Sequence, residues 1–412
     1  MTQFPMGFWL YKDADAVPVE QTADWEELGM TLTLMPRYTA GVSDPDHVRA
    51  LLDAAQARGI RVIMNDSRCD WARLTEQGEN AYIRGLQQAV GEFGDHPAVW
   101  AWHVGDEPSR EAMEDACLAC RLVRRYAPCH RAFINLFPDV EHLHNLGFPS
   151  WDMYLDEMVE HGELEFLCYD CYAQMKPEKN GWDTYFRNLR EYQQAAHRHG
   201  IPFWTTLLTI GHFDYRCPSL DDMRWQLYTA AAHGASGVLW FYVYAIDGVF
   251  CNYREAAVNI HGKKTRTYDD LSDTCCTFQN YFARILIGLQ LEKVQHLYHA
   301  YGGTPLFEGD DVCDARTGWI EAGGADTALI LSYFVDKDGR RYVMMTNNSC
   351  TDSVKAQIVL HGERRVFWCA YGNREIEKDM LSSDNGPIWR ADGCTGVPHW
   401  LAPGQAFLIR YE

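Results

Sequence analysis

The sequence lacks any uninterrupted apolar run of about 18 residues, the length a helix needs to cross a membrane. Its first residues, Met1-Thr2-Gln3-Phe4-Pro5, contain no basic region and no apolar stretch long enough for a signal peptide. Basic residues are scarce as well, because 37 Lys and Arg stand against 57 Asp and Glu and the net charge is −20. We therefore expect a cytoplasmic protein whose partners do not include nucleic acid, other polyanions or a membrane.

Signatures of metal and cofactor sites are also missing. No His-x-His follows the first predicted strand, which disfavours a metal-dependent amidohydrolase barrel. Cys117-x-x-Cys120 and Cys168-x-x-Cys171 have the spacing of zinc ligands, but the second pair lies in a predicted strand. Alternate side chains of a strand point to opposite faces, so Cys168 and Cys171 point apart. We expect the 14 scattered cysteines to be reduced, and we expect no metal and no cofactor.

What the chain does contain is a regular alternation of apolar strands and helical segments. The predicted strands cover 6–11, 30–35, 60–65, 98–104, 131–137, 164–172, 201–210 and 238–244. Helical segments lie between most of them, and Ser219 with Asp222 predicts one helix start. Eight such strands over about 245 residues predict an α/β fold, a (β/α)8 TIM barrel. The stretch Tyr11 to Asp15 offers no Gly-rich phosphate loop, which disfavours a doubly wound sheet.

The last part of the chain has a different pattern. After a predicted helix over 267–291, short strands are expected at 329–335, 342–346, 354–360, 365–370 and 406–411. Asp336-Lys337-Asp338-Gly339 between the first two of these is a hairpin signal. We expect a catalytic barrel over 1–295 and a C-terminal all-β sandwich domain over 296–412. The sandwich is expected to support the barrel, and it is the candidate for a contact between copies in a homo-oligomer.

The stretch from Trp100 to Arg110 joins an apolar strand to two adjacent carboxylates, Asp106 and Glu107. Pro108 favours an extended Glu107, and Ser109 is a suitable N-cap for the helix that follows. The carboxyl ends of barrel strands carry the chemistry of this fold, so both carboxylates are candidates for catalysis. The alternative is an acidic pair that only complements the dipole of the next helix.

Aromatic and carboxylate side chains dominate the other predicted strand ends. Carboxylic acids can protonate a leaving oxygen and activate or replace water, and aromatic rings hold a sugar, so this mixture suits acetal hydrolysis. His103 and His212 are expected to be core or hydrogen-bonding histidines rather than metal ligands, and Trp240 and Tyr242 could equally fill the barrel. The candidates for contact with a carbohydrate are Trp9, Tyr11, Asp66, His103, Asp106, Asn135, Tyr172, His212, Trp240 and Tyr242.

The phrase His96-Pro97-Ala98-Val99-Trp100-Ala101-Trp102, followed by Asp106-Glu107-Pro108, resembles the fourth strand of retaining clan-A glycoside hydrolases. These include the beta-galactosidase-like and related families, in which an Asn-Glu-Pro triplet carries the acid/base. Here Asp106 replaces the Asn. The resemblance covers the barrel to about residue 290, a barrel length typical of the fold. It implies that Glu107 is the acid/base.

The sequence departs from this clan at the seventh strand, where the clan has a nucleophilic Glu. Here the stretch Trp204 to His212 contains no carboxylate, and Asp214 follows only in the loop. We expect Asp170, at the end of the sixth strand, to be the second carboxylate. It could instead accept hydrogen bonds from loop N–H groups, which would leave Asp66 or Asp106 for the role. A shorter Asp across two strands favours an inverting or substrate-assisted mechanism, whereas the clan resemblance favours retention.

The predicted function is therefore a glycoside hydrolase that cleaves a glycosidic bond in an oligosaccharide or glycoside by carboxylate acid/base catalysis. One alternative is a carbohydrate-binding pseudoenzyme, since the seventh-strand Glu is missing. Another is a barrel enzyme of a different class, a lyase or a metal hydrolase.

Overall fold

Each of the eight apolar runs predicted as barrel strands overlaps a parallel strand in the computed structural model. It describes residues 3–140, 146–177, 181–310, 313–317, 328–383 and 386–412. The strands are β1 Met6–Phe8, β2 Leu32–Leu34, β3 Arg61–Met64, β4 Val99–Asp106, β5 Arg131–Asn135, β6 Leu167–Asp170, β7 Phe203–Leu208 and β8 Val238–Phe241.

These strands close into a ring. They form two parallel four-stranded sheets, ordered β2-β3-β4-β5 and β1-β8-β7-β6. A parallel bridge between Leu136 and Tyr169 joins β5 to β6. At the other junction the Thr31 N–H donates to the Met6 carbonyl over 2.8 Å and joins β1 to β2. The predicted TIM barrel is confirmed, and the carboxyl ends of all eight strands meet at one opening.

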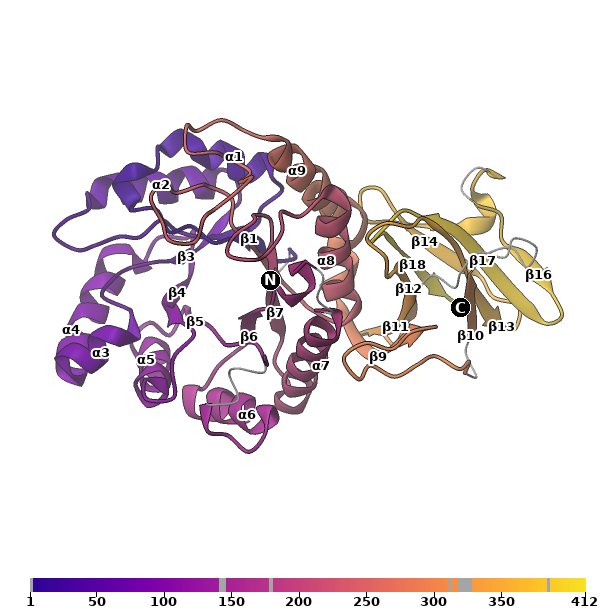
Figure 1. Ribbon diagram of the computed structural model, residues 1–412, viewed down its shortest axis with the longest axis horizontal. Helices are drawn as coiled ribbons and strands as arrows, with labels where there is room; N and C mark the ends of the chain where they lie inside the picture. The colour runs from indigo at the N-terminus through magenta and orange to yellow at the C-terminus, as the bar shows by residue number, and fades with distance from the viewer. Residues whose placement is uncertain (1–2, 141–145, 178–180, 311–312, 318–327, 384–385) are drawn as a thin grey trace.

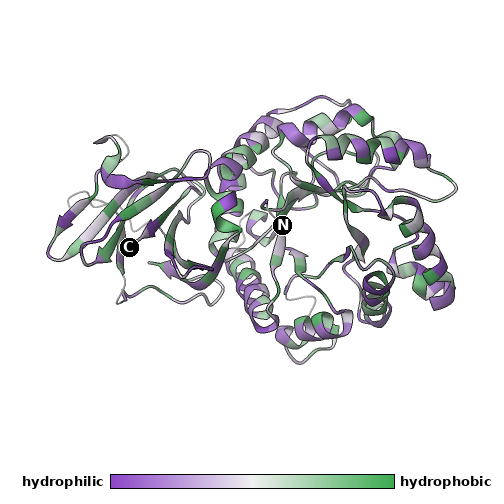
Figure 2. Cartoon of the chain, turned by 180° about the vertical axis from the view of Figure 1, so that it is seen from behind, coloured by the Kyte–Doolittle hydropathy of each residue, from purple (hydrophilic) through white to green (hydrophobic). Residues whose placement is uncertain are grey.

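Helices surround the barrel (Figure 1), and most of them bury an apolar face on the strands and leave a hydrophilic face outside (Figure 2). The predicted start of helix α8, Leu220–Ala232, is confirmed, since Ser219 and Asp222 form a reciprocal capping box. The helices are α1 Thr22–Glu27, α2 Pro45–Ala57, α3 Trp71–Gln77, α4 Glu79–Ala89, α5 Met113–Tyr126, α6 Trp151–Gly162, α7 Trp182–His199, α8 Leu220–Ala232, α9 Arg266–Phe278 and α10 Arg284–Leu286. Short 3-10 or π turns are η1 Ala14–Ala16, η2 Val19–Gln21, η3 Val90–Gly94, η5 Ala173–Met175, η6 Gln279–Ala283 and η7 Lys378–Met380.

The predicted helix over 267–291 is too long at its end. The helical segment stops at Leu286, and Leu289 already begins strand β9. β9 pairs with β11 in the second part of the chain, so sheet pairing overrides the local helical pattern there. β9 lies across the predicted division between residues 295 and 296, which stays a prediction.

The C-terminal part consists of two antiparallel sheets, which confirms the predicted all-β sandwich. One sheet has the order β15-β14-β18-β12-β11-β9, and the other has the order β10-β13-β17-β16. The strands are β9 Leu289–Leu297, β10 Cys313–Thr317, β11 Leu329–Asp336, β12 Arg341–Asn347, β13 Val354–His361, β14 Val366–Ala370, β15 Arg374–Glu377, β16 Trp389–Ala391, β17 Cys394–Leu401 and β18 Ala406–Tyr411.

The larger sheet is buried on both faces. One face packs on the second sheet, and the other, with Ile330, Tyr342 and Leu408, belongs to the same apolar cluster as the barrel helices. Helix α8 lies directly on β11 and β12 (Figure 1). The Ser332 hydroxyl donates to the carbonyl of Ala232 over 2.7 Å across this interface. The sandwich therefore shares a core with the barrel.

Trp225 of α8 is the central side chain of this contact. It has no exposed surface, its ring lies 4.5 Å from that of Trp182, and its Nε1 donates to Asn348 Oδ1 over 2.8 Å. We expect Trp225→Ala to lower the free energy of unfolding by about 3–5 kcal/mol, the cost of a deleted buried Trp. The urea midpoint measures it. Trp400→Ala is the control, because 64% of that side chain is exposed and little packing is lost. Equal midpoints for the two variants would contradict a shared core.

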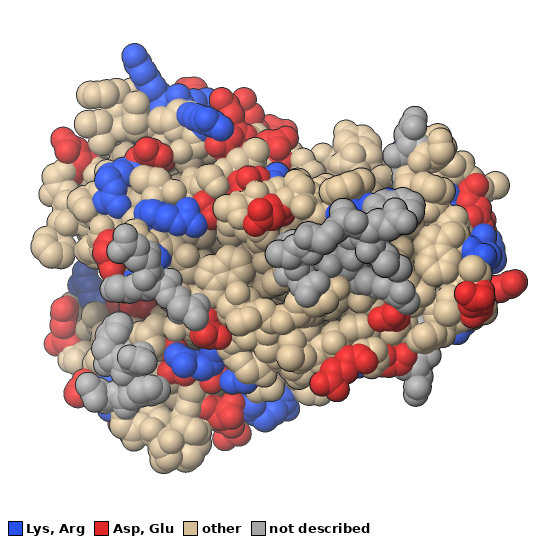
Figure 3. Space-filling view, turned by 45° about the vertical axis from the view of Figure 1, so that its right-hand side comes forward, with Lys and Arg blue, Asp and Glu red and all other residues tan. Residues whose placement is uncertain are grey.

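No helix in the described part of the chain is long and apolar enough to span a membrane. On the face shown in Figure 3, the described Lys and Arg side chains are dispersed among Asp and Glu rather than gathered into one basic surface.

Candidate active site

The end of β4 is distorted in a way that directs two carboxylates into the barrel opening. Its pairing with β5 shifts register between His103 and Gly105. Gly105 has φ +153°, and a Cβ there would lie 2.2 Å from the ring of Trp71, so this position requires glycine. Glu107 follows with φ +44°, and its N–H donates to the Asn135 carbonyl over 3.0 Å.

This geometry corrects two predictions. Glu107 is in the left-handed region rather than extended, because the bulge and the bond to β5 outweigh the preference set by Pro108. Ser109 does not cap a helix, since its hydroxyl donates to Glu111 over 2.9 Å and α5 begins only at Met113. A turn thus separates Asp106 and Glu107 from the start of α5. This separation argues against the alternative that the acidic pair only complements the dipole of that helix.

Asn135 connects the ends of three neighbouring strands. Its Nδ2 donates to Oδ1 of Asp106 over 3.0 Å and to Oδ1 of Asp170 over 2.7 Å. Tyr11 donates to Oδ2 of Asp106 over 3.4 Å, and the Tyr172 hydroxyl donates to Asp170. The ends of β1, β4, β5 and β6 therefore meet around Asp106, Glu107 and Asp170, which we call the carboxylate cluster.

The pKa values in the carboxylate cluster are all raised. Burial is the largest cause for each residue, and the charge of a neighbouring carboxylate adds to it. Hydrogen bonds from Asn135 oppose the rise at Asp106 and Asp170, but no hydrogen bond opposes it at Glu107. Among the described residues, no Lys or Arg forms an ion pair with Asp106 or Glu107. Glu107 therefore keeps its proton more readily than an ordinary glutamate does, as the sequence predicts.

The carboxylate cluster can be reached from solvent. Asp106 is exposed, Glu107 and Asp170 are half-buried, and Tyr11 exposes 36% of its surface. Protein surrounds these groups on the remaining sides, which is why burial still dominates their pKa values. A ligand entering the barrel opening would meet carboxyl groups whose pKa values are all raised.

Aromatic side chains form the floor and wall beside the carboxylate cluster. The Trp9 ring lies 5.7 Å from Tyr11, and its Nε1 donates to Thr206 over 3.0 Å. The Tyr242 hydroxyl accepts from the Tyr11 N–H over 3.1 Å. Trp9, Tyr172 and Tyr242 are all buried, so they hold Tyr11 and Asp170 in place and leave Tyr11 as the accessible ring.

Two residues predicted to contact a ligand, Trp240 and Asp66, do not face the carboxylate cluster. Trp240 has no exposed surface and packs in the outer layer between strands and helices, because its side chain points out of the barrel. Both carboxylate oxygens of buried Asp66 accept from the Arg68 guanidinium, at 3.0 and 2.7 Å. These positions correct the expectation of ligand contact, and we leave both residues out of the proposed site.

The two predicted histidines occupy different places. Burial lowers the pKa of each to about 4, so both are neutral at ordinary pH. His212, after β7, packs 5.7 Å from the ring of Tyr172 and 5.0 Å from that of Phe241. His103 faces a polar hollow of about 170 Å³ that also contains Asp66 and Asp70.

Asp70 is a residue that the sequence did not indicate as part of the site. It caps α3 by accepting from the Ala72 N–H over 2.8 Å, and burial raises its pKa. Its charge also contributes to the raised pKa of Asp106. An Asp that precedes a helix start is usually a cap, so only the position after a third barrel strand could have drawn attention to it.

The end of β7 has no carboxylate, as the sequence predicts. Thr209 stands there instead, accepting from the Tyr242 N–H over 2.8 Å and donating to its carbonyl over 3.1 Å. Asp214 lies farther along the loop, 3.5 Å from Lys176 and with 55% of its side chain exposed. Among the described residues, no three His, Cys, Asp or Glu side chains are grouped so that they could hold a metal ion.

Comparison with known proteins shows the fold. No family profile and no curated protein matches the chain. Among solved structures, it is similar to a beta-galactosidase from Bacillus circulans sp. alkalophilus, with 8% identity, a TM-score of 0.59 and coverage of 100% of this chain and 99% of that one. A catalytic mutant of a GH42 beta-galactosidase from G. stearothermophilus has 9% identity and a TM-score of 0.59, and the match covers 100% of this chain and 98% of that one. A family 5 glycoside hydrolase from Bacteroides vulgatus has 12% identity and a TM-score of 0.57, and the match covers 99% of this chain and 89% of that one.

Coverage is smaller for two other similar structures. The chain spans 59% of a beta-galactosidase from Marinomonas ef1 and 58% of one from Halorubrum lacusprofundi. At such low identities the likeness establishes a barrel with a C-terminal sandwich, and the roles of individual residues have to be argued from the site itself.

Proposed function

We propose that the chain is a glycoside hydrolase whose active site is the carboxylate cluster, with a carbohydrate as substrate. The observation that carries the proposal is the convergence of Asp106, Glu107 and Asp170 at the carboxyl ends of β4 and β6, linked by Asn135. Structures of similar fold are glycoside hydrolases, which supports the same reaction class.

Glu107 is the general acid in this proposal. Hydrolysis of an acetal needs a carboxylic acid that is still protonated near neutral pH and lies beside the leaving oxygen. The raised pKa of Glu107 meets the first requirement, and its half-buried position at the barrel opening meets the second.

Asp170 is the second carboxylate. Two hydrogen bonds, from Asn135 and Tyr172, favour its ionised form, whereas Glu107 receives none. This difference favours the protonated form at Glu107 and the ionised form at Asp170. Asp106 and Asn135 position Asp170, and Tyr11 is the accessible ring for a sugar.

A screen of nitrophenyl glycosides identifies the sugar, and glycosides of that sugar with poor leaving groups then test the proposal. A fall of their turnover by about 10²–10⁴-fold in the Glu107→Gln variant supports it. A second candidate, a carbohydrate-binding pseudoenzyme, is favoured by the absence of a carboxylate at the end of β7. That candidate requires saturable binding of a sugar, measured by calorimetry, with no hydrolysis of any glycoside.

We expect a bell-shaped dependence of kcat/KM on pH, displaced to higher pH than ordinary carboxyl groups would give. Activity needs ionised Asp170 and protonated Glu107, so it rises as pH passes the raised pKa of Asp170 and falls as pH passes that of Glu107. The charge of Asp106 raises the pKa of both residues. Asp106→Asn should therefore move the rising limb to lower pH, by on the order of one unit. Rising limbs that coincide in the two proteins would contradict the assignment.

A further inference from the structure

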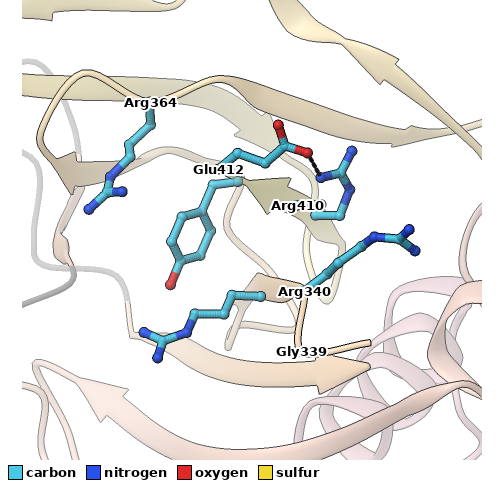
Figure 4. A pocket seen from close by; sticks show the side chains of 7 residues that line it. Gly339, Arg340, Arg364, Arg410 and Glu412 are labelled. Carbon is cyan, nitrogen blue, oxygen red and sulfur yellow. Dashed lines mark hydrogen bonds and ion pairs between the residues drawn. The ribbon is translucent and has the colours of Figure 1, made fainter. Parts of the chain in front are cut away.

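A second concave site lies in the sandwich, away from the carboxylate cluster. It is a hollow of about 520 Å³, which we call the arginine hollow (Figure 4). Four of its seven lining residues are arginines, in a chain whose net charge is −20. The lining residues are Gly339, Arg340, Arg341, Arg364, Arg410, Tyr411 and Glu412.

Two of these arginines are already paired. Arg410 donates to Glu375 over 2.6 Å and to Glu412 over 2.5 Å, and Figure 4 shows the second pair at the edge of the hollow. Arg340 lies 3.3 Å from Asp338. The charges of Arg410 and Arg340 are therefore offset by carboxylates of the protein.

Arg341 and Arg364 differ from them. In the part of the chain that the structure describes, neither lies within ion-pair distance of a carboxylate. Arg364 uses one N–H, its Nε, on the His361 carbonyl over 2.9 Å. The positive charges of Arg341 and Arg364 are therefore not neutralised by any described side chain.

The guanidinium groups of Arg341 and Arg364 both affect the pKa of Tyr411. Arg341 stands directly opposite Tyr411 in the pairing of β12 with β18, so their side chains share a face. Burial raises the pKa of the Tyr411 hydroxyl, while a hydrogen bond from Arg341 and the charge of Arg364 oppose that rise. Two like charges near one buried hydroxyl repel each other, and an anion between them would relieve that repulsion.

We propose that the arginine hollow binds an oxyanion group (a carboxylate, sulfate or phosphate) between Arg341 and Arg364, with Tyr411 nearby as a polar contact. The planar fork of donors on a guanidinium matches such groups with two parallel hydrogen bonds. An adjoining hollow of about 400 Å³ shares Arg341 and Tyr411, and its other lining residues are Glu292, Lys293, Asp310, Tyr333, Phe334 and Tyr342. It has room for the body of a molecule that carries the anion.

Calorimetric titration of the full chain tests the site, with inorganic phosphate, sulfate and glucuronate as probes at constant ionic strength. We expect saturable binding of at least one probe. Stronger binding of glucuronate would identify an acidic sugar, and stronger binding of phosphate or sulfate a free inorganic ion. Either result supports the site. Absence of saturable binding for all three probes would overturn it.

Variants locate the binding. Arg341→Gln and Arg364→Gln should each weaken it by about tenfold, the loss expected for one charge-assisted hydrogen bond. Arg266→Gln removes the same charge from α9, where 90% of the side chain is exposed, and should leave binding unchanged. Equal weakening in Arg266→Gln, or full binding in both hollow variants, would overturn the proposal. Two independent single variants keep the test open if one fails to fold, which the urea midpoint reports.

Discussion

Glu107→Gln is expected to lower kcat on glycosides with poor leaving groups by about 10²–10⁴-fold, the contribution of a general acid. The amide has the shape of the carboxyl group but cannot transfer a proton to the leaving oxygen. Nitrophenyl glycosides should lose less, because nitrophenolate leaves without full protonation. The falling limb of the pH profile should also disappear, since it reports loss of the Glu107 proton.

Glu111→Gln is the matched control for this variant. Glu111 lies in the same turn but is exposed, and hydrogen bonds from its own backbone N–H and from the Ser109 hydroxyl lower its pKa. It is therefore ionised and cannot serve as an acid near neutral pH. Its replacement should leave the rate unchanged. A Glu107→Gln protein that keeps its rate on poor leaving groups, or that keeps the falling limb, would show that the acid is another residue.

The fold was predictable because its signals are local and repeated. The runs predicted as strands over 98–104, 164–172 and 201–210 overlap β4, β6 and β7, and Ser219 with Asp222 marked a helix start correctly. The end of the last helix was wrong because β9 is held by pairing with β11, a contact between segments distant in the sequence. Local propensity cannot detect such pairing.

The candidate site was predictable only in part, for a related reason. Position at a strand end identified Asp106, Asn135 and Asp170, which the structure brings together around one amide. It could not tell which face of β8 Trp240 occupies, nor that Arg68 engages both oxygens of Asp66. Strand-end position places a residue near an opening, while the direction of a side chain depends on bulges and partners elsewhere.

Asp170→Asn should reduce kcat by a similar factor, about 10²–10⁴-fold. The substitution is conservative in shape, and the amide oxygen can still accept from Asn135, so the barrel should keep its stability. What is lost is the negative charge that activates water or attacks the sugar. Asp214→Asn is the control, since Asp214 is the carboxylate nearest in sequence to the end of β7. A large loss in Asp214→Asn with little loss in Asp170→Asn would transfer the role to the loop.

The anomeric configuration of the first-formed sugar then distinguishes an inverting from a retaining mechanism. β4 and β6 are separated by β5, so their backbones are roughly 9–10 Å apart. Aspartate is shorter than the glutamate that the clan has on the seventh strand, and it spans less of that gap. We therefore expect Asp170 to act through a water molecule and to give the inverted anomer, as carboxyl groups about 6.5–9.5 Å apart do. Proton NMR during the first turnovers measures the anomer. A retained configuration together with a glycosyl adduct trapped on another carboxylate would remove both the inverting mechanism and the role of Asp170.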